Sequence, residues 1–154
     1  MKTLLDVFGT ANIGKSTAIK EAYFKLLIKA NKNVDIQKAR ANFPGEIEGE
    51  VINYLGKKIG FLGYGDDGAN RKKILILIEL ECDIIVCASR TKGASLYNVG
   101  DLAKQHDYQI VYMCPFSYDK SQKHLLPSPD AFKHDLVEIN ADCIVDFIDK
   151  AINY

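Results

Sequence analysis

The chain has 154 residues, of which 47% are hydrophobic and 26% charged, and its 20 basic residues balance its 20 acidic ones. This size and composition predict one ordinary globular domain over residues 1–154, with no overall field that would draw it to nucleic acid or anionic lipid. The longest apolar run, residues 74–78, is far shorter than the ~18 residues that a membrane span requires.

A strand, a glycine loop and a helix are predicted at the start of the chain. Residues 2–8 are mostly apolar and end at a glycine, which predicts a strand. Residues 16–31 repeat apolar side chains every three or four positions, which predicts a helix with one buried face. Between them, residues 9–16 match the spacing G-x-x-x-x-G-K-[ST] of a phosphate-binding loop, in the context that this motif requires.

The residue types in this loop suit a polyphosphate. The two glycines allow the backbone to curl so that successive N–H groups point inward, and the following helix adds the positive end of its dipole. Lys15 can reach the β- and γ-phosphates, the hydroxyl of Ser16 can bind Mg²⁺, and Thr17 lies nearer the α-phosphate. The nucleotide-binding residues that we predict are Gly9, Thr10, Ala11, Asn12, Ile13, Gly14, Lys15, Ser16 and Thr17.

The match over residues 4–30 resembles the P-loop NTPase superfamily. The resemblance implies a P-loop NTPase-type fold and the use of Mg-ATP or Mg-GTP, with Lys15 in a catalytic role. Phosphoryl transfer in such proteins is mainly positioning and charge neutralisation. The GTPase branch reads guanine with a motif of the type N-K-x-D, and no such motif follows the later predicted strands. ATP is therefore the expected nucleotide, and GTP is less favoured.

A short strand, a turn and a hairpin are predicted next. Residues 34–37 are a strand candidate, and residues 43–45 (Phe-Pro-Gly) have the composition of a turn. Residues 49–55 and 57–64 are two β-rich runs on either side of Gly56, so we expect at least one antiparallel strand.

An acidic pair follows this hairpin. P-loop proteins usually carry an acid at the end of an apolar strand, and the nearest match is Asp66 and Asp67, although residues 63–65 separate the apolar run from them. We assign this pair a catalytic role in positioning water or magnesium, with Asp66 as a metal ligand beside Ser16. The alternative is a turn and a helix cap. Asp6, inside the first strand, is expected to be hydrogen-bonded structurally rather than catalytic.

Residues 70–81 are compatible with a strand by composition, but a clearer strand at residues 83–88 follows almost at once. Parallel neighbours need a crossover of about a dozen residues, so we predict a buried helix over residues 70–81. Arg90 directly follows the strand, at the end where open α/β sheets bind ligands, and is a candidate to contact the substrate or the γ-phosphate. The alternative is a solvated loop arginine. The basic run 71–73 is a weaker candidate for a phosphate clamp.

The last predicted elements are a helix at residues 96–106, a strand at residues 109–114 and a helix at residues 141–152 that Asn140 caps. The alternation of strands and helices predicts a three-layer α/β fold. Its sheet is expected to be mostly parallel, with an antiparallel hairpin strand.

Residues 115–129 form a long polar segment with two further prolines at its end, and are predicted as a loop. Long loops in compact domains are usually functional or disordered. Two alternatives are open for this one. Lys120 and Lys123 are candidates to close on phosphates, and Phe116 and Tyr118 are candidates to stack on adenine.

The four cysteines, at positions 82, 87, 114 and 143, form no C-x-x-C pair and have no ligand spacing with the three histidines. We predict that they are reduced core residues and not a metal site. This cysteine usage favours a reducing, cytoplasmic location.

Three functions are compatible with these features. The first is a small ATPase or nucleotide-dependent switch, in which Asp66 or Asp67 positions the attacking water. The second is a small-molecule or nucleotide kinase, in which Asp35 or Arg90 holds the acceptor. The third is a non-catalytic nucleotide-binding module, to which a protein partner supplies a missing arginine or acid. No heptad pattern indicates an oligomer.

Overall fold

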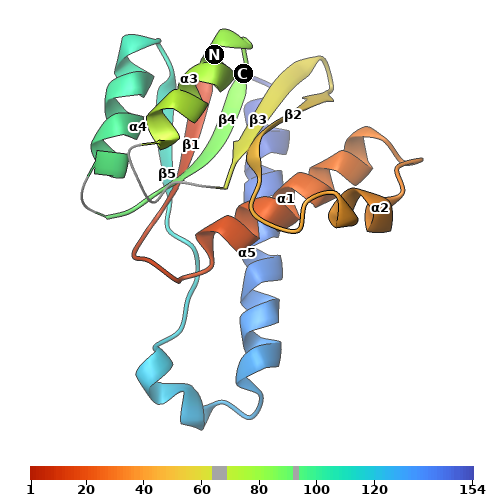
Figure 1. Cartoon of the computed structure of the whole chain (residues 1–154), viewed down its shortest axis with the longest axis vertical. Helices are drawn as coiled ribbons and strands as arrows, with labels where there is room; N and C mark the ends of the chain where they lie inside the picture. Colours follow the sequence, from red (N-terminus) through yellow and green to blue (C-terminus); the bar gives the residue numbers. More distant parts are fainter. Residues whose placement is uncertain (64–68, 92–93) are drawn as a thin grey trace.

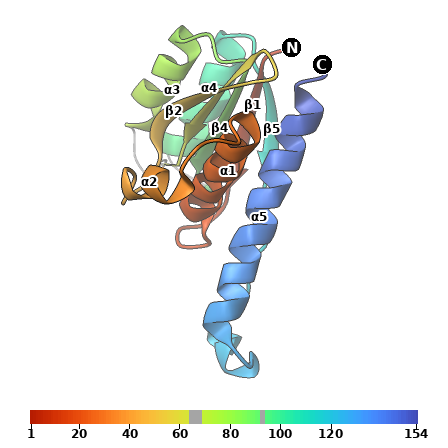
Figure 2. The ribbon, with the colours of Figure 1, turned by 90° about the vertical axis from the view of Figure 1, so that its right-hand side faces the viewer.

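The chain folds around a sheet with helices on both of its faces (Figures 1 and 2). The computed structural model describes residues 1–63, 69–91 and 94–154, and within these residues the sheet has five strands in the order β2-β3-β4-β1-β5. The strands are β1 (Thr3–Phe8), β2 (Glu48–Tyr54), β3 (Lys57–Leu62), β4 (Ile84–Ser89) and β5 (Gln109–Met113). β3, β4, β1 and β5 are parallel, and β2 pairs antiparallel with β3.

The helices form a layer on each face of the sheet. α1 (Lys15–Ala30) and α5 (Pro129–Ala151) cover one face, and α2 (Ile36–Ala41) packs against α1. α3 (Asn70–Glu79) and α4 (Ala94–Gln105) cover the other face. α5 begins well beyond the sheet, next to the short 3₁₀ helix η1 (Lys120–Leu125) (Figure 1). In the described parts of the chain, no helix combines the length and the apolar character that crossing a membrane requires.

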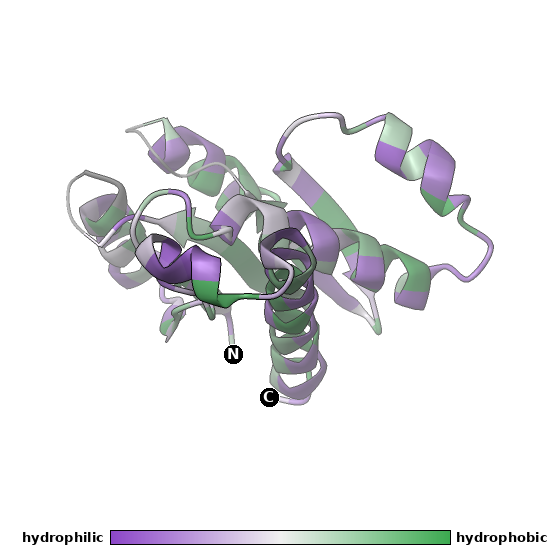
Figure 3. Ribbon diagram, turned by 90° about the horizontal axis from the view of Figure 1, so that it is seen from below, coloured by the Kyte–Doolittle hydropathy of each residue, from purple (hydrophilic) through white to green (hydrophobic). Residues whose placement is uncertain are grey.

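The alternation of side chains along each strand produces these layers. Leu5 and Val7 of β1 pack with α1 and α5, whereas Leu4 points to the opposite face and packs with α3 and α4. The inner strands β1 and β4 are mainly hydrophobic, whereas the edge strand β2 is largely polar. The helices carry both hydrophilic and hydrophobic residues (Figure 3). The predicted α/β class, with a mostly parallel sheet and one antiparallel pair, is confirmed.

The predicted hairpin and the predicted helix over residues 70–81 are also confirmed, as β2, β3 and α3. Leu55 and Gly56 connect the two hairpin strands and have φ angles of 49° and 80°. Two left-handed residues in a two-residue turn match the natural twist of paired strands. This local geometry fixes the register of β2 against β3.

The predicted strand at residues 34–37 is wrong, because the chain enters α2 at this point. Asp35 is the N-cap: its carboxylate accepts hydrogen bonds from the backbone N–H groups of Gln37 (3.1 Å) and Lys38 (3.2 Å). Such a cap satisfies N–H groups that have no partner within the helix. The carboxylate that we considered for holding an acceptor is therefore engaged in capping a helix.

The last helix begins at Pro129 and not at Ala141, and Asn140 lies within it and is not its N-cap. Proline is favoured in the first turn of a helix because its missing N–H group has no intrahelical acceptor there. Residues 130–135 are all exposed, so this part of α5 has no apolar stripe that periodicity would reveal. The predicted loop at residues 115–129 is also interrupted by η1.

The prediction that all four cysteines are core residues is correct for only two of them. Cys82 and Cys87 are buried, whereas Cys114 and Cys143 are exposed. Cys114 directly follows β5, which is an edge strand, and Cys143 lies on the solvent side of α5. All four thiols are free.

Candidate functional site

The loop between β1 and α1, residues 9–14, turns with left-handed backbone at two positions. Asn12 has a φ of 63° and Gly14 a φ of 89°. Gly14 is the N-cap of α1 and makes no side-chain hydrogen bond at that cap. Left-handed residues beside ordinary ones direct successive N–H groups into a common concavity, and the first N–H groups of a helix have no intrahelical acceptor. This end of α1 is therefore suited to an anion.

Gly9 fixes the base of the loop. Its N–H group donates to the carbonyl oxygen of Ser89 (3.2 Å), which ties the loop to the end of β4. A Cβ atom on Gly9 would lie 2.2 Å from Cδ1 of Ile13, so the isoleucine packs directly onto the glycine. Any other residue at position 9 would displace Ile13.

Lys15 folds back over the loop. Its residue is only 5% exposed, and its ammonium group donates to the carbonyl oxygens of Gly9 (2.5 Å) and Thr10 (3.1 Å). A positive charge is thereby held at the concavity. Phosphate oxygens can take the place of these carbonyl oxygens after a small rotation of the flexible side chain.

A cleft of about 430 Å³ opens over the loop and the first turn of α1. Its charged lining consists of Lys15, Lys120, Lys133 and Glu46, so positive charge predominates. Of the nine predicted nucleotide-binding residues, those that line the cleft are Ala11, Asn12, Gly14, Lys15, Ser16 and Thr17. Gly9 and Thr10 instead contribute their carbonyl groups to holding Lys15.

The chain returns to this loop after β5. We call residues 116–139, which contain η1 and the first turns of α5, the arm. Lys120 of the arm donates from Nζ to the carbonyl oxygen of Asn12 (2.8 Å). Two lysines of the arm, Lys120 and Lys133, line the cleft. Lys123, the other lysine predicted to close on phosphates, is not among the residues that line it.

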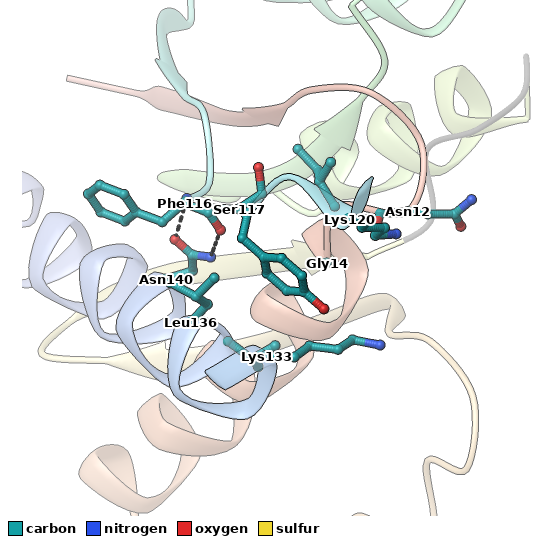
Figure 4. Close-up of a pocket in the computed structure, with 11 residues that line it drawn as sticks. Asn12, Gly14, Phe116, Ser117, Lys120, Lys133, Leu136 and Asn140 are labelled. Atoms are coloured by element: carbon teal, nitrogen blue, oxygen red, sulfur yellow. Dashed lines mark hydrogen bonds between the residues drawn. The ribbon is translucent and has the colours of Figure 1, made fainter. Parts of the chain in front are cut away.

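Asn140 fixes the root of the arm, and its residue is 2% exposed. Its side chain faces the backbone of Phe116 (Figure 4). The N–H group of Phe116 donates to Oδ1 (2.8 Å), and Nδ2 donates to the carbonyl oxygen of Phe116 (3.0 Å). The buried side chain of Asn140 thus satisfies both backbone groups of Phe116. These two hydrogen bonds join the start of the arm to α5.

A smaller cavity of about 100 Å³ lies between the loop and the arm (Figure 4). Its apolar lining consists of Ile13, Phe116, Tyr118, Leu136 and Val137. The residues that line both this cavity and the cleft are Asn12, Gly14, Lys120 and Lys133. The charged cleft therefore continues into an apolar chamber with two aromatic residues, the two that we considered for stacking on a base.

A third hollow, of about 440 Å³, shares Thr17 and Lys133 with the cleft and is lined by α1, α2 and α5. Its other lining residues are Glu21, Arg40, Asp130, His134, Val137 and Glu138. Arg40 donates two hydrogen bonds to the carboxylate of Glu21 (2.6 and 2.8 Å), and this contact lowers the pKa of Glu21. The hollow thus presents fixed charges of both signs next to the cleft.

Asp6 is hydrogen-bonded within the sheet, as predicted. It is fully buried on β1, and its Oδ2 accepts a hydrogen bond from the hydroxyl of Ser89 (2.7 Å). Burial raises the pKa of Asp6 to about 6, although the Ser89 bond and the charge of Lys15 both act to lower it. Its Oδ1 is buried without a hydrogen-bond partner.

The other predicted catalytic residues are not brought together in the described part of the site. Arg90 is exposed at the carboxyl end of β4 and is not among the described residues that line the cleft. Asp66 and Asp67 lie outside the described residues. In the basic run 71–73, Arg71 donates to Gln105 of α4 (3.4 Å) and Lys73 pairs with Glu48 (3.3 Å).

Three residues that line the cleft are not among the predicted site residues: Glu46, Ala88 and Lys133. Glu46 follows a predicted turn, and Lys133 was placed between a predicted loop and a predicted helix. No local signal marks Glu46, because its place is set by contacts of its chain neighbours with Lys20 of α1 and with Gly63. The signal for Lys133 was Pro129, which begins the helix that carries it.

Comparison of this chain with models of protein families, with curated proteins and with solved structures gives no match. What the site can bind follows from its own residues.

Proposed function

We propose that this chain is a P-loop protein that binds a magnesium–nucleoside triphosphate over residues 9–17, with ATP ahead of GTP, and hydrolyses it. The observation that carries the proposal is that one cleft combines the glycine loop, the first turn of α1 and three lysines. A triphosphate carries several negative charges on closely spaced oxygens, which such N–H groups and ammonium groups complement. The loop also leaves the carboxyl end of an inner parallel strand, where open α/β sheets bind ligands.

The apolar cavity favours a nucleotide over inorganic phosphate. It opens beside the phosphate loop and presents Tyr118, whereas Phe116 is 61% exposed and its ring points away from the other lining residues (Figure 4). Aromatic side chains stack on bases with little sequence preference. The side chain of Asn140, at its edge, is already committed to the backbone of Phe116. The preference for ATP over GTP is based on the missing guanine motif.

The oxygen donors of the cleft suit Mg²⁺. In the residues that the structure covers, no group of three or more histidine, cysteine, aspartate or glutamate side chains could hold a metal, and Mg²⁺ needs none. It commonly takes one or two protein oxygens together with phosphate oxygens and waters. Ser16 lines the cleft at the start of α1 and would supply one of these oxygens. Such an ion would supply positive charge that neutralises the phosphate oxygens.

Other residues of the chain would bind the phosphates and position the attacking water. Lys15 would move from the loop carbonyl groups to the β- and γ-phosphates, while the loop N–H groups hold the phosphate oxygens. Lys120 and Lys133 would add charge from the arm. Positioning of the attacking water is proposed for Asp66 or Asp67, and a γ-phosphate contact for Arg90.

Calorimetric titration with Mg-ATP and Mg-GTP tests the binding, and phosphate release from Mg-ATP alone tests hydrolysis. We expect Lys15→Ala to slow phosphate release by about 100- to 1,000-fold, the range for losing one group that stabilises developing charge. Lys32→Ala, which removes an exposed charge just beyond α1, should leave the rate unchanged. The absence of both heat and a thermal shift at millimolar Mg-nucleotide would overturn the proposal.

Transfer to an acceptor is a second candidate reaction, because a charged hollow adjoins the cleft through Thr17 and Lys133. Its fixed carboxylates and Arg40 could hold a small polar acceptor. If Mg-ATP alone gave no phosphate release, and ADP formed only when a metabolite mixture was added, a small-molecule kinase would be favoured. Binding without turnover in either assay would favour a nucleotide-binding module that acts through a protein partner.

A further inference from the structure

Glu46 is an acidic residue in a cleft that is otherwise positive. It is exposed, and it lines the cleft together with Lys15 and Ser16. Within the described residues its carboxylate makes no hydrogen bond and no ion pair. A carboxylate at this place repels a polyphosphate, unless a divalent cation lies between them.

Contacts on both sides of Glu46 hold its backbone next to the start of α1. On the N-terminal side, the ammonium group of Lys20 donates to the carbonyl oxygens of Phe43 and Gly45, each at 2.5 Å. Lys20 lies four residues after Ser16, so both occupy the same face of α1. The turn before Glu46 is thereby fastened to the helix face that carries the Ser16 hydroxyl.

On the C-terminal side, Ile47 is fully buried, and its carbonyl oxygen accepts a hydrogen bond from the N–H group of Gly63 (2.7 Å). A Cβ atom on Gly63 would lie 3.4 Å from this same oxygen and 3.6 Å from the carbonyl oxygen of Ser16. Ile47, Gly63 and the first turn of α1 are therefore in close contact. Glu46 is held between two fixed neighbours, with only its side chain exposed to the cleft.

We propose that Glu46 is the carboxylate that faces the magnesium ion of the bound nucleotide and holds it, directly or through a water molecule, beside Ser16. This role rests on the proposed function. Mg²⁺ selects hard oxygen ligands and is usually bound through one or two carboxylates in addition to phosphates, so a hydroxyl and a carboxylate in one cleft suit it. Glu46 is then a metal-ordering residue that acts on the nucleotide through the ion.

Binding of a non-hydrolysable ATP analogue, measured by calorimetry with Mg²⁺ and again with EDTA, tests this role without any turnover. With Mg²⁺, we expect Glu46→Gln to bind the analogue about 10- to 100-fold more weakly than the wild type, the range for residues that support a bound metal. In EDTA the same variant should bind as tightly as the wild type or more tightly, because a repulsive charge has been removed. Glu46→Asp, which keeps the charge on a shorter side chain, should lose less affinity with Mg²⁺.

Glu48→Gln is the matched control, because it removes the same charge two residues further along. Glu48 pairs with Lys73 and does not line the cleft, so we expect wild-type affinity in both conditions. An equal loss for Glu46→Gln with Mg²⁺ and with EDTA, or no loss at all, would show that Glu46 does not face the ion. If the wild-type protein itself bound no analogue, the proposed function would fail, and the role of Glu46 with it.

Discussion

Asp6 and Ser89 form a buried polar pair at the point where β1 and β4 lie side by side. Ser89 connects to β1 through its hydroxyl, which donates to Asp6, and to the loop at residues 9–14 through its carbonyl oxygen, which accepts from Gly9. Asp6 also experiences the charge of Lys15, which lowers its pKa, although burial has the larger, opposite effect. The loop is therefore connected through Ser89 to a carboxylate whose pKa is shifted by burial and by the charge of Lys15.

This carboxylate makes stability depend on pH between about 4 and 6. The pKa of Asp6 is raised from 3.8 to about 6 in the folded protein, so the folded state holds a proton that the unfolded state releases. The contribution favours folding at low pH and is lost as pH rises through this window, by about 3 kcal/mol. Asp6→Asn removes this titration. Urea unfolding at several pH values should therefore show the wild type losing stability relative to Asp6→Asn as pH rises from 4 to 7, and parallel curves would contradict the prediction.

At the scale of elements, the amino-acid sequence indicates β1, the loop and α1 well, because the motif and the periodicity of α1 are local. α3 was also predictable, although its composition resembles a strand, since parallel strands need a crossover between them. α2 was missed because a side-chain cap from Asp35 decides its start. The first turns of α5 were missed because they are exposed and have no core to face.

The candidate site divides in the same way. Lys15, Ser16 and Thr17 were identified from adjacent residues, and all three line the cleft. Glu46 and Lys133 were not identified, because their positions depend on contacts between segments far apart in the chain. Glu46 lies beside the loop because Lys20 of α1 donates hydrogen bonds to the backbone of residues 43 and 45.

The two hydrogen bonds between the Asn140 side chain and the backbone of Phe116, which we call the clasp, join α5 to the segment after β5. Asn140→Ala leaves the N–H and carbonyl groups of Phe116 without their partner in a part-buried position. We expect a loss of about 1–3 kcal/mol in the free energy of unfolding, measured by urea titration. Asn153→Ala, which removes an exposed amide near the end of the chain, should change it by less than about 0.5 kcal/mol. Equal effects of the two substitutions would argue against the clasp.

At the scale of the whole molecule, the arm stands away from the sheet and contacts the loop at residues 9–14 through Lys120 (Figure 1). If Lys120 and Lys133 bind phosphate oxygens, nucleotide should slow hydrogen exchange of the backbone amides in residues 116–139. The slowing can reach about 100-fold at a nucleotide concentration 100 times Kd. Mass spectrometry with and without Mg-ATP measures it. Lys120→Gln should reduce the protection and Lys123→Gln should not. Equal exchange with and without nucleotide would show that the arm does not take part in binding.

The two ends of the described chain meet on the side of the sheet away from the arm (Figure 1). The terminal amino group of Met1 donates to the carbonyl oxygen of Tyr154 (3.2 Å). A short peptide joining these ends, with the gene reopened at the exposed Leu55–Gly56 turn, would give a circular permutant in which β1, the loop and α1 lie in the middle of the chain. Affinity tags or fluorescent fusions attached at Met1 or Tyr154 would likewise project away from the cleft and leave it accessible to ligands.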